Sequence, residues 1–204
     1  MTSIGQALVV LALATGWALH VHSLRRRLER SRHDPLTGLW TRYGWTRRAE
    51  QVIRRRPRAV VLLADLDGFK AVNDAHGHAA GDAVLVAAGA RLTAWCGAHG
   101  VAGRLGGDEF VAVVDGDARL DDRLAELAEL LRQPVEHQGV RLIVGASIGA
   151  ARLSELPERT LEDALKAADQ AMYQVKGRTR RGRRLLTPAL AALRGLPQRM
   201  RLAA

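Results

Sequence analysis

Two acidic segments of this 204-residue chain have the residue types of a metal-dependent phosphoryl-transfer site. The first, Asp65–Lys70, begins where the apolar run 59–64 ends, and its Asp65 and Asp67 alternate in phase, so they project to one side of a strand. The second, Gly106–Phe110, has two glycines followed by two acids. Glycine tolerates a positive φ and leaves room for a ligand beside the backbone, so this segment is typical of a tight turn.

The elements expected around these segments would bring them to one edge of a sheet. The apolar run 58–64 suits a strand that is buried on both faces. The runs 101–105 and 110–114 read as a β-hairpin joined through the two glycines. If the first strand lies beside this hairpin, Asp65 and Asp108 face each other across that edge.

Carboxylates brought that close repel each other unless a cation lies between them. Magnesium takes hard oxygen ligands and shares its shell with substrate phosphates, and two such ions can bridge the attacking and leaving oxygens of an in-line displacement. Lys70 would add positive charge toward a triphosphate, and the backbone amides of Gly68 and Phe69 could donate to it. Each segment alone is also ordinary turn chemistry, but their joint occurrence favours a magnesium–nucleotide reaction.

Several separate motifs between Asp34 and Leu186 resemble those of the GGDEF-domain diguanylate cyclases. These motifs are Asp34–Leu39, Asp65–Lys70 followed by Asn73-Asp74, Gly77–Asp82, Arg104–Phe110, and Ala168–Tyr173 with Lys176. The resemblance implies that two GTP molecules condense to cyclic di-GMP and two pyrophosphates. It also implies a homodimer, because each domain would hold one GTP and each 3′-hydroxyl must attack the other nucleotide.

The resemblance assigns the metal and the catalytic base to matching positions. Asp65, the Leu66 carbonyl and Asp108 would bind magnesium, with two ions in each active site. Asp108 would also take the proton of the ribose 3′-hydroxyl, and Glu109 would support the metal site. Lys70 completes the catalytic set.

Other matching residues would bind the nucleotide. Asn73 and Asp82 would read the guanine edge, and a carboxylate that accepts from guanine N1 and N2 rejects adenine. Gly68, Phe69, Lys70, Lys176 and Arg180 would contact phosphates, and His78 is either a further ligand or a turn residue.

The chain departs from the family pattern at three places. Gly97 and Gly100 stand where many members carry the Arg and Asp of a product-inhibition site, so we expect no feedback inhibition there. After Lys176 the usual glycine is displaced, which leaves the role of Arg180 open. Thr41 stands where the family usually has Asn.

The N-terminal segment predicts a membrane anchor. Residues 1–24 contain no Asp, Glu, Lys or Arg, and five arginines follow between residues 25 and 32. About 20 apolar residues span a bilayer, and arginines on the C-terminal flank predict that this side is cytoplasmic. We therefore expect a single-pass protein of a bacterial cell membrane with a cytoplasmic catalytic domain. The alternative is a buried amphipathic or dimerising helix.

The remaining organisation follows from charge and periodicity. We expect a transmembrane helix over 1–24, a basic linker over 25–33, a catalytic domain over 34–187 and a basic tail over 188–204. The formal net charge of +10 belongs to the two ends, since nine basic residues and no acid occur from Lys176 onward. Cys96 is the only cysteine, so no intrachain disulfide can form. A solvated face or a lipid headgroup contact explains the basic ends, and no nucleic acid is expected, because few aromatics interleave with the tail.

The element order predicts an α+β fold. Helical stripes over 41–56, 84–95, 120–131 and 161–175 alternate with strand-like runs, the last of them over 141–147. This order is typical of a mostly antiparallel, ferredoxin-like sheet flanked by helices on one face, as in polymerase palms and nucleotidyl cyclases. The leading hypothesis is an active diguanylate cyclase. The alternatives are a non-catalytic GTP-binding signalling module, an effector of cyclic di-GMP, and a basic nucleic-acid-binding membrane protein.

Overall fold

The computed structural model describes residues 32–176 continuously, together with residues 6, 8, 9, 11, 13–17 and 19–21. A five-stranded sheet forms the centre of the domain, in the order β1 (Trp40–Thr41), β3 (Val101–Gly106), β4 (Glu109–Asp115), β2 (Ala59–Asp67) and β7 (Gly145–Arg152). The β1–β3 pair is parallel, whereas the β3–β4, β4–β2 and β2–β7 pairs are antiparallel. The α+β prediction is thus confirmed for the domain, and its sheet is mixed.

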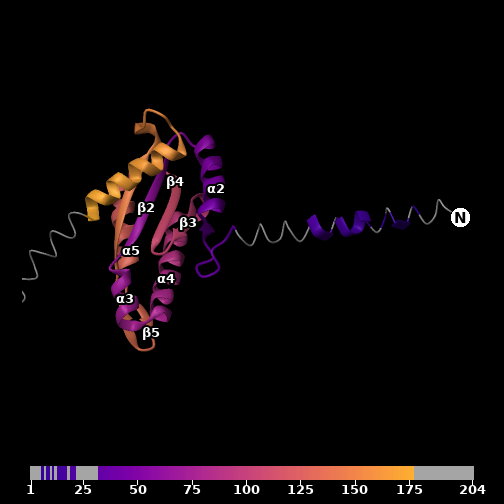
Figure 1. Ribbon diagram of the computed structural model, residues 1–204. Helices are drawn as coiled ribbons and strands as arrows, with labels where there is room; N and C mark the ends of the chain where they lie inside the picture. The colour runs from indigo at the N-terminus through magenta and orange to yellow at the C-terminus, as the bar shows by residue number, and fades with distance from the viewer. Residues whose placement is uncertain are drawn as a thin grey trace, which may run out of the picture.

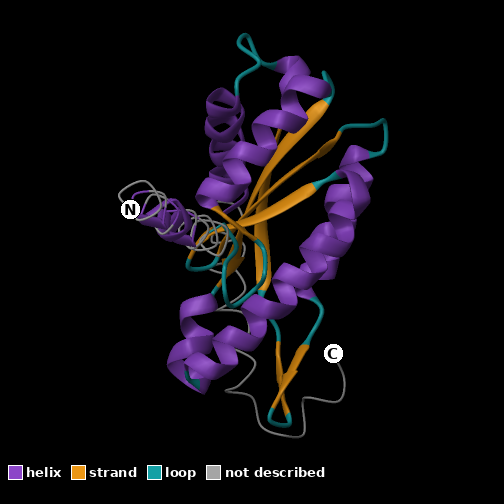
Figure 2. Cartoon of the chain, turned by 90° about the vertical axis from the view of Figure 1, so that its right-hand side faces the viewer, coloured by secondary structure: helices purple, strands orange, loops and turns teal. Residues whose placement is uncertain are grey.

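Helices cover both faces of this sheet, rather than the one face expected from the sequence (Figures 1 and 2). On one face, β2 residues such as Val60 and Leu62 pack in a core cluster with Val84 of α4 (His78–Cys96) and Leu127 of α5 (Leu120–Arg132). On the other face, Val61 packs in a cluster with residues of α2 (Arg42–Arg55) and of the helix over 161–176. The cause is β2 itself, which is apolar at every position from 59 to 64 and therefore needs cover on both sides.

The shorter elements lie at the ends of the sheet. Helix α3 (Phe69–His76) follows β2, and 3₁₀ turns occur at Gly97–His99 and Leu153–Glu155. The strand expected over 141–147 is divided between β6 (Val140–Leu142) and β7, and β6 pairs with β5 (Val135–His137) in a separate hairpin. This hairpin projects from one end of the domain (Figure 2).

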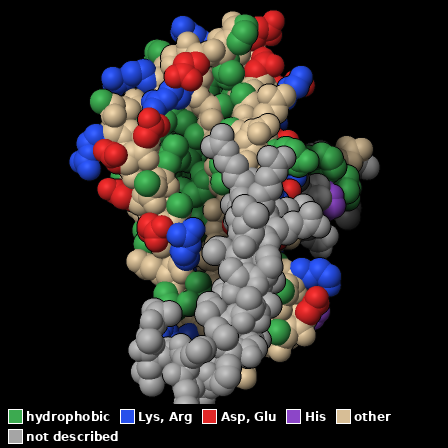
Figure 3. Space-filling view, turned by 90° about the vertical axis from the view of Figure 1, so that its left-hand side faces the viewer, with side chains coloured by type: hydrophobic (Ala, Val, Ile, Leu, Met, Phe, Trp, Pro, Cys, Tyr) green, Lys and Arg blue, Asp and Glu red, His purple; other side chains and the backbone are tan. Residues whose placement is uncertain are grey.

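Helix α2 begins at Arg42, one residue after the start that the sequence predicted at Thr41. The Thr41 hydroxyl accepts a hydrogen bond from the Gly44 amide at 3.5 Å, which caps the helix. Threonine in place of the usual asparagine therefore retains an oxygen for the N-cap. On the described part of the face drawn in Figure 3, acidic and basic side chains are interspersed around hydrophobic ones.

The predicted transmembrane helix over residues 1–24 is wrong, and so is the cell-membrane localisation derived from it. Among the described residues, no helix combines the length and the apolarity that a bilayer crossing requires. A spanning helix needs about 20 consecutive, predominantly apolar residues. Polar Gln6, Thr15 and His20 interrupt the described part of this segment. The linker prediction falls largely, and the basic-tail prediction entirely, outside the described residues.

Candidate functional site

The two acidic segments lie side by side at one end of the sheet. Asp65 at the end of β2 is directly opposite Glu109 at the start of β4, and the Leu66 amide donates to the Asp108 carbonyl at 3.3 Å. The antiparallel register of β2 and β4 thus brings Asp65 and Asp108 to the same edge. The structure therefore has the juxtaposition that the sequence predicted between these segments.

The turn that carries Asp108 depends on its two glycines. Gly106 has φ of 144° and Gly107 has φ of 54°, which L side chains rarely adopt. The β3–β4 register also shifts between Arg104 and Gly106, as in a β-bulge. The glycines let the chain turn sharply, so that Asp108 lies at the tip of the hairpin and beside β2.

The Asp108 carboxyl lies in an environment that disfavours its charge. Burial raises its pKa above the ordinary value, and repulsion from Asp65 raises the pKa further, whereas Lys176 and Arg104 act in the opposite direction. A cation bound between Asp65 and Asp108 would relieve this repulsion. The pair therefore has the electrostatics of a cation site.

The donor set fits magnesium. In the described part of the chain, no three His, Cys, Asp or Glu side chains are grouped as metal ligands. Magnesium, however, is usually bound by one or two carboxylates, with substrate phosphates and water completing its octahedral shell. Asp65 and Asp108 supply the two carboxylates, and the Leu66 carbonyl is the neighbouring hard oxygen on β2.

Lys176 forms an ion pair with Asp65, one of these two carboxylates. Its Nζ lies 2.8 Å from Oδ2 of Asp65, with the two side chains 31% and 14% exposed. The helix over 161–176 reaches this position because it packs very closely on β7. A Cβ at Gly149 would collide with the backbone of Ala168 and Met172, so glycine permits that approach.

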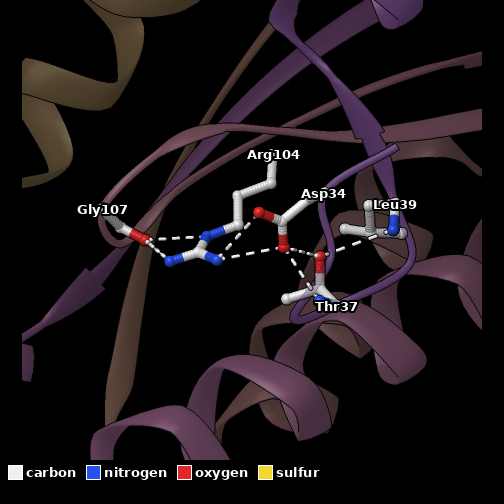
Figure 4. A network of polar contacts seen from close by, with 5 residues as sticks. All are labelled: Asp34, Thr37, Leu39, Arg104 and Gly107. Atoms are coloured by element: carbon white, nitrogen blue, oxygen red, sulfur yellow. Dashed lines mark hydrogen bonds and ion pairs between the residues drawn. The ribbon is translucent and has the colours of Figure 1, made fainter. Parts of the chain in front are cut away.

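Arg104 links the tip of the hairpin to the N-terminal end of the domain (Figure 4). Its Nε and Nη2 donate to the Gly107 carbonyl at 3.0 and 2.8 Å, and its Nη1 lies 3.0 Å from Oδ2 of Asp34. Asp34 also accepts from the amide and the hydroxyl of Thr37. The network holds the turn that precedes Asp108 against the segment 34–39.

The network also determines the ionisation of Asp34. Burial alone would raise the pKa of Asp34, but the hydrogen bonds from Thr37 and Arg104 and the charge of Arg104 together lower it. Sequence reasoning recognised Asp34 and Arg104 only as parts of motifs and gave them no role. The short spacing Asp34-x-x-Thr37 was the available signal, because it is typical of a side chain that closes a turn.

The residues expected to bind the nucleotide lie on the other side of Asp65, on α3 and α4. Gly68 begins this region with φ of 78°. A Cβ at Gly81 of α4 would collide with Asn73 of α3, so the glycine lets these helices approach closely. Asn73 is thereby placed against α4 beside exposed Asp82, while Phe69 packs against the core.

The cationic residues predicted to contact phosphates lie in different surroundings. Lys70 pairs with Asp74 at 3.0 Å on α3, and its side chain is 87% exposed. His78 is the exposed first residue of α4. Arg180 lies outside the described residues. Of the expected phosphate contacts, only Lys176 touches the Asp65–Asp108 edge in the described structure.

Asp67 and Ser147 are two polar residues that the sequence prediction left without a role. The buried Ser147 hydroxyl donates to Oδ1 of Asp67 at 2.8 Å, and Ser147 lies directly opposite Asp65 in the β2–β7 register. The two-residue spacing of Asp65 and Asp67 had placed both on one face of a strand, but it did not indicate that Ser147 would be the partner of Asp67.

Comparisons with known proteins agree with this geometry. The family profile described as "Diguanylate cyclase, GGDEF domain" matches residues 31–182. The chain therefore belongs to the GGDEF diguanylate cyclase family.

Individual relatives extend the comparison. A Streptomyces ambofaciens protein, described as "Uncharacterized 19.3 kDa protein in repSA 5'region", is 56% identical over 88% of this chain and 97% of its own length. The diguanylate cyclase DgcN of Escherichia coli K12 is 33% identical over 78% of this chain, but this match covers only 41% of DgcN. A crystal structure of a sensory box/GGDEF family protein from Caulobacter crescentus CB15 has a TM-score of 0.66 and 39% identity, over 72% of this chain and 98% of that one.

Proposed function

We propose that this chain is an active diguanylate cyclase that condenses two GTP molecules into cyclic di-GMP and two pyrophosphates. The observation that carries the proposal is the pairing of Asp65 and Asp108 at one edge of the sheet, where burial and mutual repulsion raise the pKa of Asp108. Membership of the family and the similarity to DgcN support the choice of reaction.

Asp65, the Leu66 carbonyl and Asp108 are the groups that we assign to magnesium, with two ions in each active site. When bound, these ions would neutralise the charge that develops on the reacting phosphate. Asp108 would accept the proton of the ribose 3′-hydroxyl as the general base. Glu109, opposite Asp65, would support the same edge.

The nucleotide would lie between this edge and α3–α4. Asn73 would hydrogen-bond to the guanine edge, and the Asp82 carboxylate would accept from guanine N1 and N2. Adenine lacks that donor pair, so an unpaired Asp82 would penalise ATP. The Gly68 and Phe69 amides, Lys70 and Lys176 would contact the phosphates. Arg180 and His78 are further candidates for these contacts.

The reaction requires two domains that face each other, so we propose a homodimer with a shared active site. Each domain would present one GTP, and a two-fold encounter would align each 3′-hydroxyl with the other α-phosphate.

We propose that product does not inhibit this enzyme through residues 97 and 100. Neither glycine has a side chain to bind it. A Cβ at Gly100 would lie 2.8 Å from both Cβ and the carbonyl oxygen of Cys96, and Gly97 has φ of 63°. The backbone of this turn therefore favours glycine at both positions, and introducing Arg and Asp there would strain it.

The test is to incubate the full chain with GTP and Mg²⁺ and to measure cyclic di-GMP by chromatography and mass spectrometry. We expect dinucleotide from the wild type, and a loss of roughly a hundredfold or more in Asp108→Ala, since general-base catalysis contributes about that factor. Asp122→Asn, on the exposed start of α5, is the matched control and should retain activity.

Two outcomes would contradict the proposal. GTP binding without dinucleotide, even with enforced dimerisation, would favour the non-catalytic signalling module. Full activity of Asp108→Ala would remove the assigned base.

A further inference from the structure

We propose that the Lys176 ammonium acts as the counter-cation of Asp65 in the metal-free protein. In this proposal a divalent cation displaces the ammonium from the Asp65 carboxylate when it binds. The inference deepens the proposed function and rests on it, because it concerns how the same site takes up its metal. The one interaction that carries it is the 2.8 Å contact between Nζ of Lys176 and Oδ2 of Asp65.

Because of its position, the Lys176 ammonium competes with a metal ion for the Asp65 carboxylate. Asp65 is the carboxylate that both β4 and β7 flank, opposite Glu109 on one side and Ser147 on the other. Its side chain is only 14% exposed, so a charge on it is poorly solvated and gains from a close cation. A metal ion and the Lys176 ammonium cannot both occupy the same side of Oδ2.

The neighbouring carboxylates are held differently. Asp67 accepts a hydrogen bond from Ser147, a neutral donor. Lys70, the other lysine assigned to phosphate, pairs with Asp74 on the exposed surface of α3 and not with the acidic edge. Lys176 therefore differs from Lys70 in its ion-pair partner, because Lys176 pairs with Asp65 at the acidic edge.

The helix that carries Lys176 is held in place by its close packing on β7. Met172 and Lys176 are four residues apart and lie on one face of the helix, and Met172 is pressed against Gly149 of β7. A lysine has four methylene groups and three rotatable donors, so its ammonium can swing away without movement of the helix. Displaced from Asp65, it would carry its charge to a phosphate of the bound nucleotide.

In the absence of nucleotide, the Lys176 ammonium should weaken metal binding. The divalent cation must replace the ammonium at Asp65 and must also approach a positive charge. Removing the charge of Lys176 should therefore strengthen metal binding to the nucleotide-free protein, although the same change should weaken nucleotide binding.

The experiment measures Mn²⁺ binding to the full chain without nucleotide, from the electron paramagnetic resonance signal of free Mn²⁺. Lys176→Met should bind Mn²⁺ roughly three- to tenfold more tightly than wild type, the range expected for a partly exposed ion pair. Lys176→Arg, which keeps the charge, should bind like wild type. Lys166→Met removes the same charge from an exposed position on the same helix and should also leave the affinity unchanged.

Lys176→Gln provides a second uncharged variant in case Lys176→Met folds poorly, and it should bind as tightly. Adding Asp65→Asn to Lys176→Met should remove the gain. The inference is overturned if uncharged variants bind Mn²⁺ no more tightly than wild type, or if the gain survives Asp65→Asn. A wild-type chain that makes no cyclic di-GMP overturns the proposed function instead, so the two failures are distinguishable.

Discussion

Asp34 and Arg104 connect the turn that carries Asp108 to the start of the domain. Both side chains are mostly shielded, with 19% and 13% exposed. Because Arg104 also donates to the Gly107 carbonyl, the ion pair orients the backbone just before Asp108. A change at Asp34 should therefore affect both the stability of the fold and the position of the Asp108 carboxylate.

We expect Asp34→Asn to destabilise the protein at neutral pH by about 1–3 kcal/mol, because it weakens a charged hydrogen-bond network. The pKa of Asp34 is lowered in the folded state. Its stabilisation is therefore present above the unfolded pKa of about 3.9 and is lost as the pH falls through the lower folded value. Urea unfolding at pH 7 and pH 3 checks this.

The difference between wild type and Asp34→Asn should be smaller at pH 3 than at pH 7. Asp122→Asn, whose side chain lies on the exposed start of α5, is the matched control. A difference that stays constant over this pH range would mean that the charge of Asp34 does not stabilise the fold.

At the scale of elements, the helix over 161–176 and strand β7 act as one unit. The Gly149 position has no room for a side chain, since a Cβ would meet the Ala168 carbonyl oxygen and the Met172 amide. These are backbone atoms, so the contact cannot be relieved by a rotamer change. The position of Lys176 beside Asp65 thus depends on a glycine in a strand with no part in the chemistry.

We expect Gly149→Ala to destabilise the domain by about 1–3 kcal/mol, the usual cost of overpacking. It should also lower cyclase activity, because it pushes the helix and Lys176 away from the sheet. Urea unfolding and the dinucleotide assay measure the two effects. Gly16→Ala has nothing within 4 Å of the new Cβ and is the control. Wild-type stability of Gly149→Ala would show that the helix is not packed as closely as described.

At the scale of the whole molecule, the chemistry exceeds what one copy can do. A single domain has one Asp65–Asp108 edge and one α3–α4 region, whereas the proposed product contains two guanosines. The dimer is therefore the active species in the proposed function. Its formation should limit the rate wherever monomers predominate.

We expect the rate of cyclic di-GMP formation to depend on the square of protein concentration in that regime, so that doubling the concentration raises the rate about fourfold by mass action. Initial rates over a concentration series, with sedimentation measured in the same buffer, check this. A rate proportional to concentration in a sample that sediments as monomer would contradict the shared active site.

Local sequence patterns were sufficient to predict many of the strands, helices and turns of the domain. The uninterrupted apolar run before Asp65 predicted a buried strand, and the paired glycines before Asp108 predicted a hairpin turn, because period and backbone freedom are local properties. The same run should have indicated helices on both faces of the sheet. The membrane prediction relied on the absence of charge and the near-continuous apolarity of the N-terminal segment, but no helix among the described residues has the required length and apolarity.

The sequence by itself determined the α+β class, the strand–hairpin pairing and the identity of the acidic edge, since these follow from residue types at short spacing. Only the tertiary structure decided that Arg104 holds Asp34, that Ser147 holds Asp67, and that Lys176 holds Asp65. Each contact joins residues at least 70 positions apart. Such pairs depend on the register of strands and on close helix packing, which no local pattern encodes.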